Sequence, residues 1–273
     1  MKFYIVVGIR SSRFHLHLED FPSKLTNPWS SVDPGTPRSF NPSTIKKEER
    51  CAAARTSRTT ASDPMAETGV FNVTFEDYVI TTTVTSSGRA VERWIAEVLS
   101  VHRPGGVRNN LIPVGLDVEW RPSYGGPHNK AATLQLCVDR RCLIFQLLHA
   151  DHFPAALAGF LGDRGILFYG VGVRQDAERL RADHCLAVAN AVDLRGGVAD
   201  WLNRPDLRQA SLVAIVGAVM GVELVKPHRV TMSRWDARRL SDEQISYACI
   251  DAFVSSEVAR RMLSYAQRVM FVS

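Results

Sequence analysis

Three β-rich runs follow one another at residues 113–120, 131–138 and 141–148, and this succession constrains the fold more than any other feature of the chain. The segment V-D-R-R joins the second run to the third and is short enough for an antiparallel hairpin. Strands and helices then alternate, and the chain becomes mostly helical from about residue 198. The resulting order, β-β-β-α-β-α-β-α-α, predicts an α/β fold with a mixed sheet and helices on both faces.

The first 64 residues differ from the rest of the chain. They hold six of the thirteen prolines, much serine and threonine, and no sustained hydrophobic period. This composition predicts a disordered N-terminal extension over residues 1–64 and a folded domain over residues 65–273, with Met65 as a possible alternative start. The domain is expected to open with short strands at 70–75 and 78–84 and an amphipathic helix at 90–103.

The net charge of +5 does not by itself indicate a nucleic-acid ligand, because residues 1–64 carry +4 of it and the other 209 residues carry +1. Five cysteines without a C-x-x-C pair argue against a disulfide framework or a zinc site. Reduced thiols are expected, including Cys137 and Cys142 on facing hairpin strands. No apolar run approaches the ~18 residues of a membrane span. We therefore expect a soluble intracellular protein of the nucleus, the cytoplasm or both, with no membrane partner.

The segment G-L-D-V-E-W places two carboxylates inside an otherwise apolar strand. Successive strand residues point to opposite faces, so Asp117 and Glu119 share one face. The other face receives Val114, Leu116, Val118 and Trp120. Two residues of strand rise amount to roughly 6.6 Å, and two charges at that distance repel by about 2 kcal/mol at an effective dielectric constant of about 20. Either both residues lie on a solvated face, or a divalent cation sits between them.

Two further acidic residues follow in the sequence. Asp251 lies in the final helix, which begins with a capping box at Ser241 and Gln244, and Tyr247 precedes Asp251 by one turn on the same face. A buried aspartate needs a partner, so Asp251 either pairs with an arginine or Tyr247 for structural reasons, or binds a cation. Asp176 lies in the first turn of a helix, where an acidic residue also complements the helix dipole. The core face of the final helix is marked by Ile245, Ala248, Ala252, Ala259, Met262 and Leu263.

The stretch around Asp176 also offers an alternative interpretation. The segment G-V-G-V-R-Q is similar to the start of a dinucleotide-binding fingerprint, and Asp193 follows Gly172 by 21 residues at the end of a strand. Asp176, however, stands where the third glycine belongs, and its carboxylate would lie where the pyrophosphate should bind. Dinucleotide binding also leaves the other three acidic residues unexplained, which argues against it.

D-x-E on a strand, an aspartate after a strand and glycines, and Y-x3-D on a late helix together form an ordered set. The corresponding segments are GLDVEW, FYGVGVRQDAERL, KPHRVTMSRW and LSDEQISYACIDAFVS. They resemble the motifs of the DEDDy-type 3′–5′ exonucleases, and within that group those of the Werner-syndrome-type exonuclease domain, which is related to RNase D. The resemblance covers roughly residues 90–265. Two positions depart from the family pattern, Val213 where lysine is common and Phe253 where tyrosine is common.

The resemblance implies an RNase H-like fold, with a five-stranded mixed sheet of three antiparallel and then two parallel strands, flanked by helices. It implies two divalent metal ions, Mg²⁺ or Mn²⁺, and hydrolysis of DNA and/or RNA from the 3′ end to nucleoside 5′-monophosphates. Asp117 would bridge both ions, Glu119 and Asp251 would complete one site, and Asp176 would hold the other ion. Tyr247 would orient the attacking water. The alternative on the same fold is a catalytically weak nucleic-acid-binding or scaffold protein.

A basic segment before the final helix supplies the candidate substrate contacts. Lys226, Arg229 and Arg234 suit phosphate contacts, unless they form an ordinary solvated face. Trp235 could stack on a base, although a packed tryptophan is favoured. His149 and His152 have metal-like spacing in H-A-D-H, but they lie in a loop without further ligands, so we expect a structural role.

Overall fold

The computed structural model describes residues 67–104, 111–123, 125–126 and 128–270. The extension predicted over residues 1–64 and the alternative start at Met65 lie outside this range, and both stay predictions. Within the described range the strands are β1 (Thr68–Phe75), β2 (Tyr78–Thr85), β3 (Ile112–Glu119), β4 (Thr133–Val138), β5 (Arg141–Gln146), β6 (Ile166–Gly170) and β7 (Ala191–Asp193). They form one mixed sheet in the order β1-β2-β5-β4-β3-β6-β7.

Five of these strands have the predicted arrangement. β5, β4 and β3 pair antiparallel in succession, and β6 and β7 continue parallel to β3. The predicted total of five strands is wrong, because the antiparallel hairpin β1–β2 extends the same sheet through parallel pairing of β2 with β5. The alternating sequence pattern predicts both additional strands, but alternation defines the buried face of a strand and not its neighbour in the sheet.

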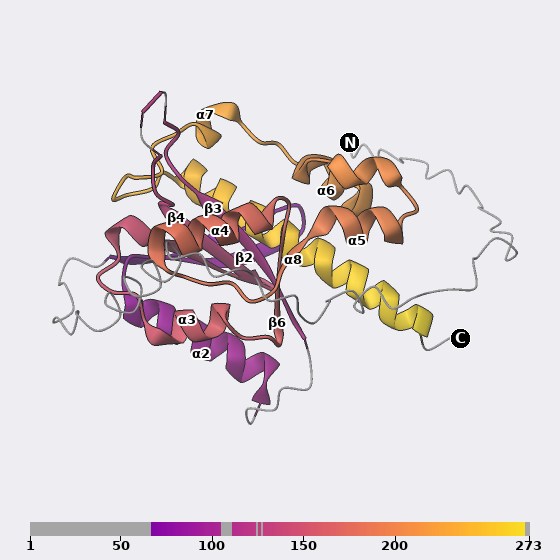
Figure 1. Ribbon diagram of the computed structural model, residues 1–273, viewed down its shortest axis with the longest axis horizontal. Coiled ribbons are helices and arrows are strands. Elements are labelled where there is room, and N and C mark those ends of the chain that lie inside the picture. Colours follow the sequence, from indigo (N-terminus) through magenta and orange to yellow (C-terminus); the bar gives the residue numbers. More distant parts are fainter. Residues whose placement is uncertain (1–66, 105–110, 124, 127, 271–273) are drawn as a thin grey trace, which may run out of the picture. The chain divides into compact units, whose positions relative to one another are not determined.

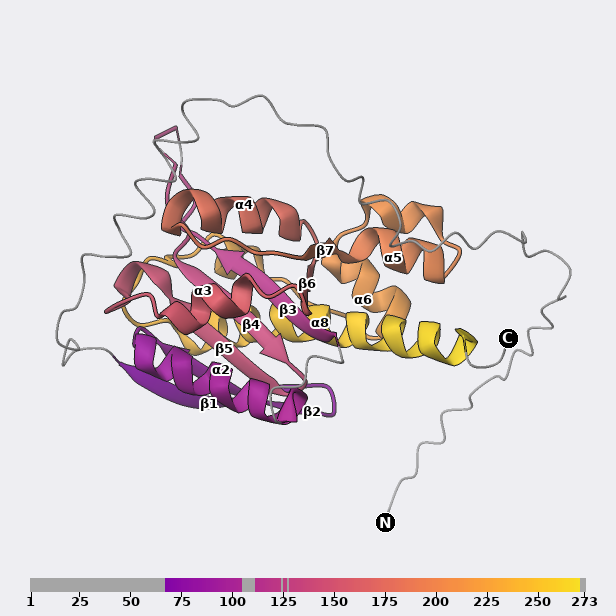
Figure 2. The same cartoon turned by 60° about the horizontal axis from the view of Figure 1, so that its bottom comes forward.

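Helices cover both faces of the sheet (Figure 1, Figure 2). On one face lie α2 (Gly88–His102), α3 (Ala155–Leu161) and α4 (Val173–His184), packed around one apolar cluster. A second cluster on the other face includes residues of α5 (Leu194–Trp201), α6 (Leu212–Met220), α7 (His228–Thr231) and α8 (Asp242–Met270). The 3-10 segments are η2 (Leu147–His149) and η3 (Pro205–Gln209). None of the described helices is both long and apolar enough to cross a bilayer.

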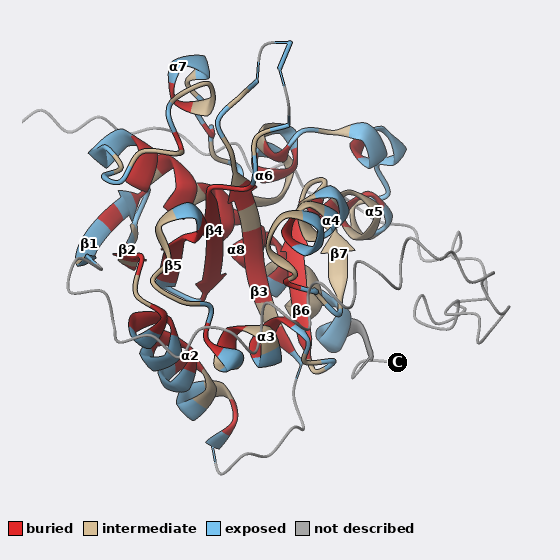
Figure 3. Ribbon diagram, turned by 60° about the vertical axis from the view of Figure 1, so that its left-hand side comes forward, coloured by how far each residue is buried: buried red, intermediate tan, exposed pale blue. Residues whose placement is uncertain are grey.

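Strand β3 runs through the buried centre of the described structure (Figure 3). Val114, Leu116 and Val118 point into the cluster beneath α2, α3 and α4, as the alternation predicts, and each is at most 2% exposed. On the β4–β5 hairpin, Cys137 and Cys142 are direct cross-strand partners with free, buried thiols.

The opposite face of β3 packs directly against the backbone of α8, and Gly115 makes this possible. A Cβ atom at Gly115 would lie 1.8 Å from the carbonyl oxygen of Ala252 and 2.9 Å from the backbone nitrogen of Ser256. Glycine therefore lets strand and helix approach more closely than any side chain allows. This contact lies two residues from Asp117 on β3 and one residue from Asp251 on α8.

The start of α8 follows the predicted capping box. The backbone N–H of Gln244 donates to Ser241 Oγ at 3.2 Å, and the backbone N–H of Ser241 donates to Gln244 Oε1 at 3.0 Å. The predicted apolar face is also confirmed. Its members are buried at Ile245, Ala248, Ala252 and Ala259 and partly buried at Met262 and Leu263.

Candidate active site

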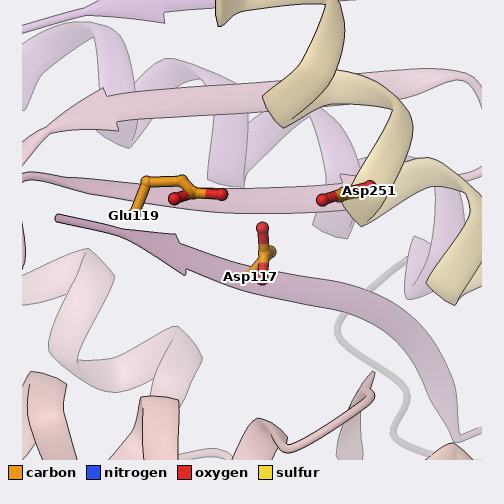
Figure 4. A group of neighbouring side chains, drawn as sticks. All are labelled: Asp117, Glu119 and Asp251. Atoms are coloured by element: carbon orange, nitrogen blue, oxygen red, sulfur yellow. The ribbon is translucent and has the colours of Figure 1, made fainter. Parts of the chain in front are cut away.

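Three of the four predicted acidic residues converge on one point. Asp117 and Glu119 extend from β3, Asp251 extends from α8, and the three side chains point toward one another (Figure 4). One carboxylate oxygen from each residue lies within 4.8 Å of the others. Two of these residues share a strand face, as their spacing predicts, and the close contact at Gly115 brings the third against them.

The electrostatics of this carboxylate cluster (Asp117, Glu119 and Asp251) favour a cation. Burial, with added repulsion from Asp251 and Asp176, raises the pKa of Asp117 well above its usual value. Burial and the charge of Asp117 likewise raise the pKa of Glu119. The Oδ2 atom of Asp117 is buried without a hydrogen-bond partner. Carboxylate oxygens are the hard ligands that Mg²⁺ and Mn²⁺ prefer, so the cluster can hold a divalent ion.

Asp251 has two close neighbours from the C-terminal third of the chain. Its carboxylate is 3% exposed, and Oδ2 lies 2.5 Å from Nζ of Lys226, in the segment between α6 and α7. The same ammonium lies 4.9 Å from the ring centre of Tyr247, one turn before Asp251. Burial raises the pKa of Asp251 while Lys226 opposes this shift. Burial and the charge of Asp251 raise the pKa of Tyr247 to about 12.

Asp176, the fourth predicted acid, lies outside the group whose oxygens are within 4.8 Å of one another, but its charge acts on both Asp117 and Glu119. It occupies the first turn of α4, whose N-cap is Gly172 in the left-handed conformation at φ 78°. Burial raises the pKa of Asp176 to about 7, although Arg179 opposes the shift.

Arg179 also covers Trp120, with its guanidinium carbon 3.8 Å from the ring centre. Trp120 is half-buried and packs against the apolar cluster beneath α2, α3 and α4, so its predicted place on the core side of the strand is confirmed. The stacked pair lies next to Asp176, because Arg179 is one turn further along α4.

Two residues of the site were not expected from the sequence. Thr133 and Gln135 on β4 are the direct partners of Glu119 and Asp117 in the antiparallel register, so their side chains lie on the same face of the sheet. Both are fully buried, and the amide nitrogen of Gln135 donates to Thr133 Oγ1 at 2.7 Å. The sequence does show two polar residues, Thr133 and Gln135, inside the apolar run AATLQLCV. Only the register of β4 with β3, however, places them opposite Glu119 and Asp117.

The candidate substrate residues separate into different environments. Arg229 makes a two-pronged ion pair with Glu243, and Arg234 is largely exposed with Asp236 at 3.6 Å. Phosphate contacts by Arg229 and Arg234 therefore stay a prediction. Trp235 is 0% exposed, and its indole N–H donates to the carbonyl oxygen of Thr231 at 3.3 Å. Base stacking by Trp235 is therefore contradicted, because no face of the ring reaches the surface.

The other candidate ligands have structural partners. His149 Nε2 lies 2.9 Å from the carbonyl oxygen of Asp236, and His152 pairs with Asp151, as the expected structural role implies. Asp193 accepts a hydrogen bond from the backbone N–H of Gly172 and pairs with Arg195. These bonds explain the spacing that suggested a dinucleotide site.

Comparison with known proteins agrees with the geometry. A family model described as 3′-5′ exonuclease matches residues 83–265. The chain belongs to this exonuclease family. A curated 3′-5′ exonuclease of Arabidopsis thaliana is 31% identical over 152 residues, covering 52% of this chain and 49% of the plant protein. One from Drosophila melanogaster is 26% identical over 159 residues, covering 57% and 45%. The chain spans about half the length of the curated relatives it matches.

Solved structures share the fold at low sequence identity. The catalytic core of RRP6 from Trypanosoma brucei has a TM-score of 0.55 and 19% identity, covering 78% of this chain and 53% of RRP6. The Nibbler EXO domain of Aedes aegypti has a TM-score of 0.53 and 16% identity, with coverages of 68% and 88%. RNase D from Escherichia coli has a TM-score of 0.52 and 18% identity, with coverages of 66% and 45%. These structures confirm the predicted fold class, and the family model confirms the predicted family.

Proposed function

We propose that this chain is a metal-dependent 3′–5′ exonuclease, which hydrolyses phosphodiester bonds of DNA and/or RNA from the 3′ end and releases nucleoside 5′-monophosphates. The observation that supports this most strongly is the convergence of Asp117, Glu119 and Asp251 on one point, with a buried Asp117 oxygen that lacks a hydrogen-bond partner. Holding three mutually repelling carboxylates together in a partly buried site is costly for a fold unless cations neutralise them. Membership of the exonuclease family supplies the reaction type.

Each residue has a distinct proposed role. Asp117, Glu119 and Asp251 would hold one divalent ion, and Asp117 and Asp176 a second, with Mg²⁺ or Mn²⁺ as the expected ions. When bound, such ions supply neutralisation of phosphate charge and activation of the attacking water. Tyr247 would position that water or the scissile phosphate through its hydroxyl group. Because the pKa of Tyr247 is about 12, the phenol stays protonated near neutral pH and acts as a hydrogen-bond donor.

The test uses 3′-recessed duplex DNA, single-stranded DNA and single-stranded RNA, each labelled at the 5′ end. The protein is incubated with Mg²⁺, Mn²⁺ or EDTA, beside Asp117→Asn and the matched control Asp206→Asn, whose carboxylate is exposed and pairs with Arg204. We expect ladders that shorten from the 3′ end only with metal, and nucleoside 5′-monophosphates as products. Asp117→Asn should lower the rate about a thousandfold, since metal ions supply several kcal/mol of transition-state stabilisation.

Asp206→Asn should retain the wild-type rate in the same assay. The three substrates also rank DNA against RNA. Metal-independent binding of these nucleic acids without any ladder would instead support the catalytically weak binding protein as the function of this fold.

A further inference from the structure

Lys226 already places a positive charge at the carboxylate cluster. Its Nζ lies 2.5 Å from Oδ2 of the buried Asp251, and its charge also acts on Asp117 and Glu119. A divalent ion held by Asp251 would use the same carboxylate that the ammonium now neutralises. Two cations this close to each other repel strongly in a site shielded from water. Ammonium and metal ion therefore compete for Asp251.

The surroundings of Lys226 allow it to leave. The residue lies in an irregular segment between α6 and α7, anchored by buried Leu224 before it and buried Val230 after it. Its side chain is 29% exposed, and its neighbour Val225 is 70% exposed. A flexible four-carbon stem on an irregular segment lets the ammonium swing outward while the backbone stays in place.

We propose that Lys226 is the resident counter-ion of the carboxylate cluster, and that a divalent ion displaces its ammonium from Asp251 and frees it to contact a phosphate of the substrate. This inference rests on the proposed function, since it concerns the same site. Lys226 would then have two partners: Asp251 in the metal-free protein, and a phosphate of the substrate in the metal-bound protein. Loading the metal then prepares the phosphate-binding group in the same step.

The first experiment measures Mn²⁺ binding by isothermal titration calorimetry at pH 8. Lys226→Met removes the charge and keeps most of the stem, and Lys130→Met makes the same change at an exposed lysine before β4. If the ammonium competes with the metal, Lys226→Met should bind Mn²⁺ about tenfold more tightly, as expected for the loss of a modest ion-pair coupling. Lys130→Met should bind as the wild type does. Unchanged or weaker binding in Lys226→Met would overturn the proposal.

The second experiment needs no variant at Lys226. The wild-type chain is reductively methylated with formaldehyde and dimethylamine–borane, and the lysine peptides are quantified by mass spectrometry with and without Mg²⁺. Lys226 should be modified several-fold faster with Mg²⁺, because it leaves its ion pair, while Lys130 serves as the internal reference. Mg²⁺ should have no such effect in Asp117→Asn. Equal Lys226 labelling with and without saturating Mg²⁺ would contradict displacement.

The two levels of inference fail differently. A wild-type protein that binds no Mn²⁺ and degrades no substrate would remove the proposed function itself. The result would remove only the role of Lys226 if the protein binds Mn²⁺ and degrades its substrate, but Lys226→Met does not tighten Mn²⁺ binding and Mg²⁺ does not change the labelling of Lys226.

Discussion

Tyr247 is the residue of the site whose chemistry is most narrowly defined by its surroundings. It is 8% exposed, packs against Trp235 with ring centres 6.0 Å apart, and accepts a hydrogen bond from Thr231 Oγ1 at 3.3 Å. Burial and Asp251 raise its pKa to about 12. A protonated phenol donates a hydrogen bond but does not remove a proton at neutral pH. The Tyr247 hydroxyl can therefore orient the attacking water but not deprotonate it.

Replacing Tyr247 with phenylalanine tests that role. Because the ring packing is kept and only the hydroxyl is lost, we expect the exonuclease rate to fall about 100-fold, with Mn²⁺ affinity and melting temperature nearly unchanged. The control is Tyr265→Phe on the same helix, where the side chain is 45% exposed and its ring centre lies 5.6 Å from that of Trp201. Single-turnover digestion of a labelled oligonucleotide measures the rate. A rate within twofold of wild type would remove Tyr247 from the mechanism.

At the residue level, the sequence predicts the acids better than their partners. Asp117 and Glu119 are recognisable because strand alternation needs only local spacing, and Tyr247 and Asp251 because a helical turn does. The ion pair of Lys226 with Asp251 joins an irregular segment to a helix, and no local period describes such a contact. The burial of Trp235 likewise depends on how the segment around α7 folds over α8.

At the scale of elements, the site depends on how closely β3 and α8 approach. Gly115→Ala would place a Cβ atom 1.8 Å from the carbonyl oxygen of Ala252, where only backbone movement relieves the clash. We expect a loss of unfolding free energy of about 3 kcal/mol. Weaker Mn²⁺ binding should follow, because Asp251 moves away from Asp117. Chemical denaturation and calorimetry measure the two effects.

Gly159→Ala is the matched control for that substitution. Gly159 occupies an exposed position in α3, and a Cβ atom added there would meet nothing within 4 Å, so alanine should stabilise the helix by about 0.5–1 kcal/mol. If Gly115→Ala behaved like Gly159→Ala, the close contact would not define the site.

The sequence predicts the existence of most elements but not their neighbours. The β4–β5 hairpin is predictable because its two-residue connection permits little else, and α8 because its capping box and apolar face agree. β2 and β5 are far apart in the sequence, and the residues of neither strand indicate that the two pair. The same holds for the register that brings Gln135 beside Asp117.

For the whole molecule, the raised carboxyl pKa values predict how stability depends on pH. A carboxyl group whose pKa is higher in the folded state binds more protons when folded than when unfolded, so the free energy of unfolding falls as pH rises. For Asp176 this window runs from its ordinary value near 4 to about 7. In EDTA, the free energy of unfolding should fall less across this window in Asp176→Asn than in the wild type, with a difference of at most about 4 kcal/mol. Urea denaturation at several pH values measures it.

Divalent metal should reverse the trend, because it binds the ionised carboxylates. At 100 times its dissociation constant, Mg²⁺ should raise the unfolding free energy by about 2.7 kcal/mol, which is roughly 5–10 °C in melting temperature. At a fixed Mg²⁺ concentration this gain should increase from pH 5.5 to pH 8, because the ionised carboxylates bind Mg²⁺ more tightly, and it should be lost in Asp117→Asn. A gain that is independent of pH, or equal in Asp117→Asn, would show that Mg²⁺ acts elsewhere.

The backbone contact between Gly115 and Ala252 also determines when the site comes into being. Asp117 and Glu119 belong to a strand in the middle of the described chain, whereas Asp251 belongs to a helix that follows every strand. A ribosome that has released all of β1–β7 has still not delivered the third carboxylate, and chains emerge N-terminus first. The carboxylate cluster therefore stays incomplete in the nascent chain until α8 has docked, so the proposed metal site can form only after every described strand has been synthesised.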